Sequence, residues 1–389
     1  MSTNRRPLAA ASPGNLPERS EAELRERQRQ GRLRVRTAAE FRQMVLETGL
    51  SEAYAGTDVV VAANAEFTDQ ASLHLGLGPA DPPIRLREPQ LGGVAALAGG
   101  GGGDLVLPIG GGGARVLADL LAGRAVEFSA TGDVTPLQPR RELHTRLDLE
   151  RIGSGRLLLH RAIGENGVVA VSSAEGVIRT PYGPLLGPFI NALFSCGGAD
   201  SIGLAMPGLS LLGPGSPVLV GGAVGWVVGS GSAHQPRPRR LPSGHARSPG
   251  AVAAVCVDLH ELGVGWVRPC HFEGVGSALL VPIAAPIPLI NGAVALQAAT
   301  GDDALEAPVL DVSIPRRIKP SFGGVPYSAL KAGRIQVDGR PIPAAPAHSP
   351  RLAAAIAAEL IARLQENRFP LRLPLAPLGP RPTLIPLDV

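Results

Sequence analysis

The chain has 389 residues, of which 44% are hydrophobic and 18% charged, and its formal net charge is +4 at pH 7. This length suits two or three domains, or one large α/β domain with an appendage, and the modest charge gives no indication of nucleic-acid binding. Three cysteines without a CxxC pair provide no zinc or iron–sulfur signature, so we expect no metal and no resident cofactor.

Cysteine usage and the N-terminus together indicate a cytoplasmic protein. So few thiols favour a reducing compartment, and the first 32 residues lack the apolar core of a signal peptide. Two uncharged stretches, 201–234 and 277–300, are long enough to cross a bilayer, but prolines and glycines interrupt both. We therefore predict buried strands in these stretches and no membrane insertion.

Residues 1–32 are rich in Arg and Glu, which predicts a disordered polar arm with a surface helix over 21–30. The α/β core begins at residue 33. Thr37 and Glu40 have the spacing of a capping box, and the apolar residues after them predict a helix over 38–48.

Residues 104–123 combine an apolar strand, four glycines and an amphipathic helix. The pattern predicts a strand over 104–109, a helix over 114–121 and a C-terminal cap at Gly123. Backbone N–H groups at the positive end of such a helix favour an anion, so this turn is a candidate ligand loop. The alternative is a tight turn that merely needs glycine, because neither Walker A nor GxGxxG spacing is present. The four residues are Gly110, Gly111, Gly112 and Gly113.

The rest of the chain predicts a strand-rich core that extends to residue 320. Residues 167–179 read as a β-hairpin. Residues 234–250 form a basic Pro/Arg loop, which is either a solvated insertion or a docking site for an acidic partner.

The C-terminal part predicts a small hairpin–helix module over 321–368, with its helix over 350–365, and a Pro-rich tail over 369–389. Together these elements predict an α/β fold. Its core is a mixed, glycine-rich sheet with flanking helices, and the hairpin–helix module is its C-terminal appendage.

Four residues stand out as candidates for chemistry. Cys196 follows Phe-Ser and precedes two glycines, so either a turn exposes its thiol or, as we favour, it is a structural residue; Cys256 lies in an apolar strand and is read as a buried small hydrophobe. Arg140 suits a carboxylate or phosphate ligand, or pairs with a surface acid. His234 ends an apolar block on a glycine-rich loop, where it faces a pocket or is an ordinary loop residue. Asp69 lies on a loop that follows a strand.

Several stretches, in order, resemble the homocysteine biosynthesis (sulfur-incorporation) proteins of archaea and bacteria. The resemblance covers residues 33–368 and is carried by DPPI (81–84), the tetraglycine loop with ARVLADLLAG, PRREL (139–143), GSAH (231–234), AVCVDLHEL (254–262) and YSALKAGRIQVDGRPI (327–342). It implies formation of homocysteine from aspartate semialdehyde by sulfur transfer and reduction. It also implies a small ferredoxin-like protein as an external electron donor.

The resemblance further implies two cysteines, and their positions fall at Asp69 and Leu137 of this chain. A carboxylate and an isobutyl group cannot carry a persulfide, and no cysteine precedes Cys196. Either Cys196 or Cys270 has taken over that role, or this chain does different work on the same fold.

We expect a pocket formed by residues 64–78, Gly110–Gly113, Arg140 and His234, in which glycine amides and Arg140 hold an anionic group of a small amino-acid-like metabolite. The leading hypothesis is a divergent member of this family, whose own sulfurtransferase activity stays open. The alternatives are a non-catalytic metabolite-binding or partner-recruiting protein, and acid–base chemistry through Asp69.

Overall fold

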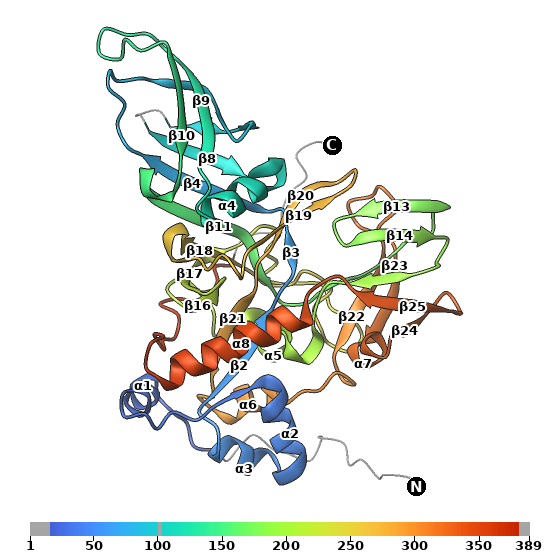
Figure 1. Cartoon of the computed structure of the whole chain (residues 1–389). Helices are drawn as coiled ribbons and strands as arrows, with labels where there is room; N and C mark the ends of the chain where they lie inside the picture. Colours follow the sequence, from blue (N-terminus) through green and yellow to red (C-terminus); the bar gives the residue numbers. More distant parts are fainter. Residues whose placement is uncertain (1–15, 100–102, 381–389) are drawn as a thin grey trace.

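A ten-stranded sheet forms the centre of the computed structural model, which describes residues 16–99 and 103–380 (Figure 1). Its strands lie in the order β1 (Val35–Thr37), β2 (Val59–Asn64), β21 (Ile283–Pro288), β16 (Pro217–Val220), β17 (Ala223–Ser230), β18 (Val252–Asp258), β11 (Ile152–Gly164), β4 (Ala71–Leu77), β8 (Asp104–Pro108) and β7 (Leu97–Ala98). Neighbouring strands are antiparallel except β1 and β2, which are parallel.

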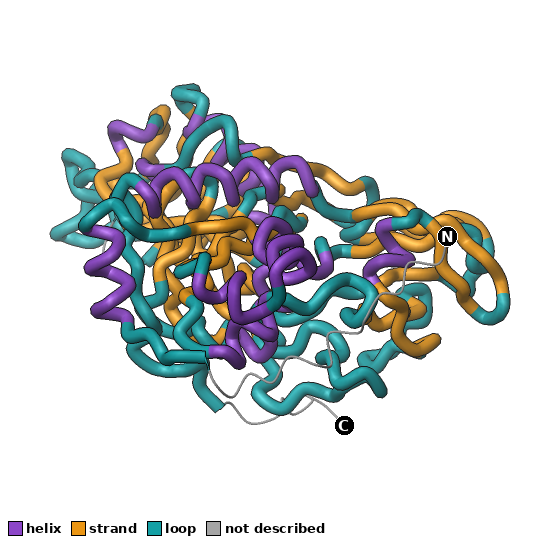
Figure 2. The backbone as a smooth tube through the Cα atoms, turned by 90° about the horizontal axis from the view of Figure 1, so that it is seen from below, coloured by secondary structure: helices purple, strands orange, loops and turns teal. Residues whose placement is uncertain are grey.

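Strands β2 and β21 are buried on both faces, which explains why their sequences are continuous apolar runs. One face packs against α2 (Ala38–Thr48), α3 (Leu50–Ala55), α5 (Ile202–Ala205) and α6 (Gly292–Ala298). The other face packs against α1 (Glu21–Arg29) and α8 (Pro350–Gln365). Figure 2 shows helices on both sides of these strands.

A second, six-stranded mixed sheet has its own hydrophobic cluster, which includes Phe194, Val309 and Tyr327. Its strands lie in the order β23 (Ser321–Pro326), β22 (Glu306–Asp311), β12 (Val169–Val171), β15 (Ala192–Phe194), β25 (Arg340–Pro346) and β24 (Arg334–Val337), and α7 (Tyr327–Lys331) packs beside them. Two small sheets complete the body: β13 (Gly176–Thr180) with β14 (Gly183–Gly187), and β19 (Arg268–Phe272), β20 (Gly276–Leu280) and β3 (Phe67–Thr68).

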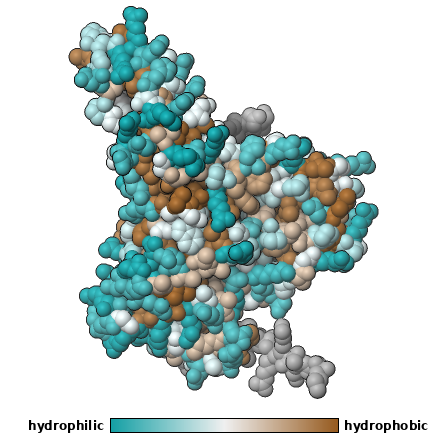
Figure 3. Space-filling model, viewed as in Figure 1, coloured by the Kyte–Doolittle hydropathy of each residue, from teal (hydrophilic) through white to brown (hydrophobic). Residues whose placement is uncertain are grey.

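A four-stranded sheet projects from the body as an arm (Figure 1). Its strands are β10 (Glu142–Leu147), β9 (Val126–Gly132), β5 (Leu86–Leu91) and β6 (Val94–Ala95), and α4 (Ala114–Leu121) lies at its base. The arm surface is mainly hydrophilic, whereas exposed apolar side chains such as Val177 and Leu186 gather over the β13–β14 hairpin (Figure 3).

The α/β fold class, with mixed sheets and flanking helices, is confirmed. Helices α2, α4 and α8 occupy the predicted ranges, and the Thr37–Glu40 capping box at the start of α2 is formed. In the described part of the chain, no helix has the length and apolarity that a membrane crossing would require.

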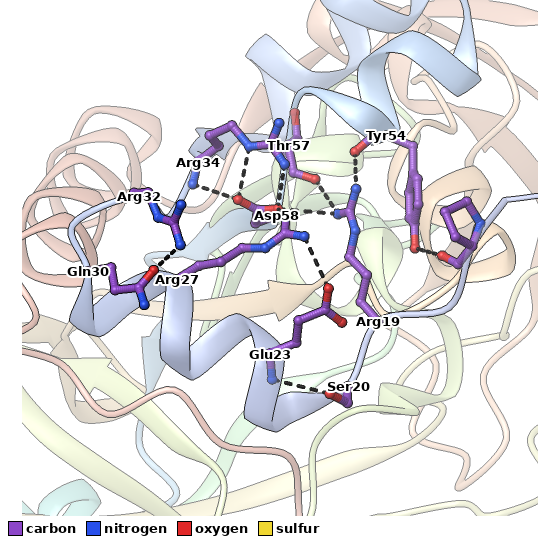
Figure 4. Close-up of polar contacts among 11 residues, drawn as sticks. Arg19, Ser20, Glu23, Arg27, Gln30, Arg32, Arg34, Tyr54, Thr57 and Asp58 are labelled. Atoms are coloured by element: carbon purple, nitrogen blue, oxygen red, sulfur yellow. Dashed lines mark hydrogen bonds and ion pairs between the residues drawn. The ribbon is translucent and has the colours of Figure 1, made fainter.

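The prediction of a disordered arm over residues 1–32 is wrong for residues 16–32; residues 1–15 lie outside the described chain. Leu24 of α1 is fully buried, and Arg19 and Arg27 reach the carboxylate of the fully buried Asp58 (Figure 4). Two of the arginines that make this segment look solvated are therefore partners of one internal acid. The polar composition of residues 16–32 therefore gives no indication that their helix packs against the body of the protein.

Three other sequence predictions need correction. Residues 321–368 are no separate module, because β23 and β25 pair with strands of the six-stranded sheet while α8 packs on the ten-stranded one. Residues 167–179 form no hairpin, because β12 pairs with β15 and β22. The 234–250 loop is packed against the body: Leu241 is buried, and Arg240 pairs with Glu165 at 3.5 Å.

The Pro-rich tail begins as predicted without regular secondary structure. Phe369 and Leu371 are buried and anchor it to the α1–α8 cluster. Residues 381–389 of the predicted tail lie outside the described chain.

Candidate functional site

A cavity of about 180 Å³ lies between the end of β2, the segment that joins it to β4, and the C-terminal half of β11. We call it the Glu66 cavity; the polar side chains in its wall that concern us are Glu66, Asp69, Arg161, Asn166, Tyr182 and Ser195. Strand β11 brings its part of the wall here because it pairs with β4, and the His160 amide donates to the Gln70 carbonyl over 2.9 Å. Residues about 90 positions apart in sequence thus share one small space.

Glu66 lies two residues after the buried strand β2 and is held by the side chain of Asn64. The Asn64 amide group donates from Nδ2 to Oε1 of Glu66 over 2.6 Å, and its Oδ1 accepts from the Ile202 amide over 2.9 Å. Burial raises the pKa of Glu66, against the opposing effects of the Asn64 hydrogen bond and the Arg161 charge. Glu66 is therefore a fixed carboxyl group whose protonation lies closer to neutrality than that of an exposed glutamate.

Arg161 enters the cavity from an irregular part of β11. The register of β11 against β18 shifts between Leu159 and Ile163, as in a β-bulge, and such a bulge redirects side chains. Throughout residues 16–99 and 103–380, no carboxylate lies within ion-pair distance of the Arg161 guanidinium. A cation that lines a cavity without an internal acid is well placed for an anionic ligand.

Tyr182 lies in the tight turn between β13 and β14, where its amide donates to the Thr180 hydroxyl over 3.1 Å. Burial raises the pKa of its phenol; Arg161 opposes this effect, while the charges of Glu66 and Asp69 add to it. The phenol therefore keeps its proton at neutral pH and can donate a hydrogen bond into the cavity.

Asp69 and the tetraglycine turn are neighbours, as the predicted pocket requires. A Cβ built on Gly110 would lie 3.6 Å from Cβ of Asp69 and 3.4 Å from its carbonyl oxygen. The Asp69 side chain is exposed at the mouth of the Glu66 cavity. The position at which the family resemblance implies a cysteine therefore borders a ligand-sized space.

The tetraglycine turn needs glycine for backbone reasons at two positions. Gly112 has φ of +114°, and a Cβ on Gly113 would approach the Pro108 carbonyl oxygen to 2.7 Å. These observations explain the sequence as a tight strand–helix turn. Anion binding by its amides stays a prediction.

Arg140 and His234 lie apart from this cavity, which corrects the predicted pocket. The Arg140 guanidinium donates from Nε to the Glu142 carbonyl over 2.9 Å, on the arm. His234 is buried, and its Nδ1 accepts from the Val252 amide over 3.0 Å. Neither residue belongs to the wall.

Leu137, the other position at which the resemblance implies a cysteine, is 85% exposed in the loop between β9 and β10. It is absent from the wall of the Glu66 cavity. The two implied cysteine positions therefore do not share one cavity within this chain.

No cysteine belongs to the wall of the Glu66 cavity in the described chain. Cys196 follows the wall residue Ser195 but is itself buried, and burial together with Glu66 raises its pKa to about 11. Cys270 packs beside Phe67 in a small apolar cluster, and burial raises its pKa also. Both thiols are protonated at neutral pH, which makes them poor nucleophiles in this state.

A larger, more open groove of about 750 Å³ lies on the other side of the tetraglycine turn, between the base of the arm and β19. We call it the Arg146 groove; it includes Gly112, Arg115, Asp119, Glu127 and Arg146. Its volume exceeds that of the Glu66 cavity, but Arg115 already faces Asp119 at 3.8 Å and is exposed. Arg146 also has no carboxylate within 4.0 Å among the described residues, but it is exposed, whereas Arg161 is half-buried. The more enclosed Glu66 cavity is therefore the better candidate for a metabolite.

Sequence reasoning missed Arg161 and Tyr182, and it included Glu66 only as one residue of the predicted pocket segment 64–78. The available signal was a charged residue in an apolar context: Arg161 interrupts the apolar run of β11, and Glu66 lies two residues after the apolar β2. A carboxyl group, a guanidinium and a phenol around one small space can bind a charged metabolite and move a proton to or from it.

Comparisons with known proteins give the relatives of this chain. A family described as "Homocysteine biosynthesis enzyme, sulfur-incorporation" matches residues 33–371. An L-aspartate semialdehyde sulfurtransferase of Methanosarcina acetivorans is 29% identical over 373 residues, covering 94% of this chain and 73% of that protein. A protein of the same name from Methanocaldococcus jannaschii is 28% identical over 340 residues, covering 82% of this chain and 64% of that protein. The comparison with solved structures found no match.

Proposed function

Because the chain belongs to the family of homocysteine biosynthesis enzymes that incorporate sulfur, we propose that it adds sulfur to a small aldehyde-bearing amino acid bound in the Glu66 cavity. The names of the relatives point to aspartate semialdehyde as that substrate. The observation that carries the proposal is Arg161, a half-buried cation with no carboxylate within 4.0 Å in the described chain, in a cavity that Asp69 also lines.

The reaction that this assignment requires balances as follows. Hydrosulfide adds to the aldehyde carbon and gives a hydroxythiol, which loses water to form a thioaldehyde. Two electrons and two protons then reduce the thioaldehyde to the thiol of homocysteine. The electrons come from an external donor, for which a small ferredoxin-like protein is our proposal.

The residues of the cavity suit the proton transfers of this scheme. The carbonyl oxygen must gain a proton as sulfur adds and must leave as water, and both steps need a nearby acid. Tyr182 holds its proton at neutral pH and is our candidate for that role. The backbone amides of the tetraglycine turn stay candidates for binding an anionic group at the mouth of the Glu66 cavity.

The cavity wall supports a route without a protein thiol. With a carboxylate at Asp69 and no cysteine in the described wall, sulfur would arrive as free sulfide, which already has the oxidation level that the scheme requires. The alternative is a metabolite-binding protein on the same fold, which the exchange of both implied cysteines also favours.

The test is to incubate the full chain with aspartate semialdehyde, sulfide and a low-potential reductant and to measure homocysteine by mass spectrometry. We expect product, and the same rate within about twofold for the Cys196→Ala, Cys270→Ala double variant, because neither thiol lines the cavity. Product that disappears in this variant while it stays folded would contradict the thiol-free route. No product in either protein, with retained binding of the substrate, would identify the metabolite-binding alternative.

A further inference from the structure

Glu66 and Arg161 have opposite charges, face the same small cavity and yet form no ion pair. Both line the Glu66 cavity, and Arg161 lowers the pKa of Glu66, so the two charges interact electrostatically. Within the described residues, however, the two groups are not within 4.0 Å of each other. A flexible arginine is normally attracted onto a nearby carboxylate, so this separation needs a cause.

The two side chains start from different, separately fixed elements. Oε1 of Glu66 is held by Asn64, which is itself fixed by the Ile202 amide. The backbone beside Arg161 is fixed by His160, whose N–H donates to Gln70 and whose carbonyl accepts from the Ser232 amide over 2.8 Å. The Glu66 carboxyl is therefore held by a bond to Asn64, and the two charged groups line one cavity from different elements.

We propose that Glu66 and Arg161 form a clamp that recognises a free α-amino acid, in which Arg161 binds the α-carboxylate and Glu66 binds the α-ammonium group. This inference rests on the proposed function, since it places the ligand in the same cavity and gives the substrate its class. Tyr182 adds a hydroxyl donor, and the ligand side chain then extends toward Asp69 and Gly110 at the mouth.

The charges decide between ligand classes. A simple anion would need Arg161 but would be repelled by an ionised Glu66, and an amine would face the reverse problem. A zwitterion satisfies both groups at once, and each bond to it is charge-assisted. A cavity of about 180 Å³ suits a metabolite of a few heavy atoms and is too small for a folded peptide segment.

The test uses three ligands that do not react and that have the same three-carbon hydroxypropyl chain in common. L-homoserine carries both charged groups, 4-hydroxybutyrate lacks the ammonium group, and 3-aminopropan-1-ol lacks the carboxylate. Isothermal titration calorimetry at pH 8 on the full chain should show that L-homoserine binds roughly 10- to 100-fold more tightly than either truncated ligand.

The variants should produce a crossed pattern. Glu66→Gln should bring the affinities of L-homoserine and 4-hydroxybutyrate close together while leaving the preference over 3-aminopropan-1-ol intact. Arg161→Met should bring the affinities of L-homoserine and 3-aminopropan-1-ol close together while leaving the preference over 4-hydroxybutyrate intact. Each ratio is measured on one protein preparation, so a partly unfolded variant does not distort it. Glu127→Gln and Arg146→Met in the Arg146 groove are the matched controls, and both ratios should stay at their wild-type values.

Two results would overturn the clamp: ratios that do not change in either cavity variant, or equal changes in the groove controls. The outcome is separate from that of the sulfur reaction. If the crossed pattern is found and no homocysteine forms, the clamp stands and the proposed function fails. If homocysteine forms and the ratios do not move, the proposed function stands and the clamp fails.

Discussion

The Asp58 carboxylate is fully buried and is bonded by Arg27 and Arg34, with Arg19 close by (Figure 4). Arg34 donates from Nε and Nη2, over 3.0 and 2.8 Å, and Arg27 donates from Nη1 over 2.6 Å. Removal of one member of a buried charged cluster leaves the others uncompensated. We predict that Asp58→Asn lowers the free energy of unfolding by about 3 kcal/mol, measured by urea denaturation at pH 7.

The same carboxylate sets a pH dependence. Burial tends to raise the pKa of Asp58, but the Arg34 hydrogen bonds and the charges of Arg34 and Arg27 outweigh it, and the pKa lies below its usual 3.8. A group with a lowered pKa stabilises the fold above its unfolded value and loses this effect as pH falls through the folded one. Wild type should therefore lose stability below about pH 4 more steeply than Asp58→Asn. Asp133→Asn, which affects an exposed pair with Arg87, is the control and should keep the wild-type slope.

Among elements, the tetraglycine turn offers the sharpest test of a local constraint. In Gly113→Ala the new Cβ would lie 2.7 Å from the Pro108 carbonyl oxygen, a backbone atom that cannot move away easily. We expect a loss of roughly 1–3 kcal/mol in unfolding free energy. Gly111→Ala is the matched control, because its Cβ would meet only the flexible ring of Pro108 at 3.3 Å, and it should change stability by less than about 0.5 kcal/mol. Equal losses in the two variants would contradict this account of the turn.

Elements with local signals could be predicted from the sequence, and elements that depend on distant partners could not. The capping box of α2, the glycines before α4 and the apolar stripe of α8 each act within one turn or helix face, and all three helices have the predicted ranges. Strand β12 was assigned to a hairpin because its neighbour in sequence is also a strand. Its true partners are β15 and β22, the latter about 140 residues away, and no local pattern specifies that choice.

Across the whole molecule, the difference between local signals and distant contacts also decides which residues of the site could be predicted. Asp69 and Gly110 were expected together and are in contact distance, because Asp69 precedes β4 and Gly110 follows β8, its antiparallel partner. Arg140 and His234 were expected beside them, but the arm carries Arg140 away and His234 is buried against Val252. Glu66 and Arg161 line the same cavity because of the strand order, which composition and periodicity do not encode.

The central claim is that the Glu66 cavity is where this chain holds an amino-acid substrate. A crystal structure of the full chain with L-homoserine tests it most directly. The account predicts the ligand in that cavity, with its carboxylate within hydrogen-bond distance of the Arg161 guanidinium and its ammonium group at Glu66. A ligand in the Arg146 groove, or an empty Glu66 cavity at a concentration that saturates binding in solution, would contradict it.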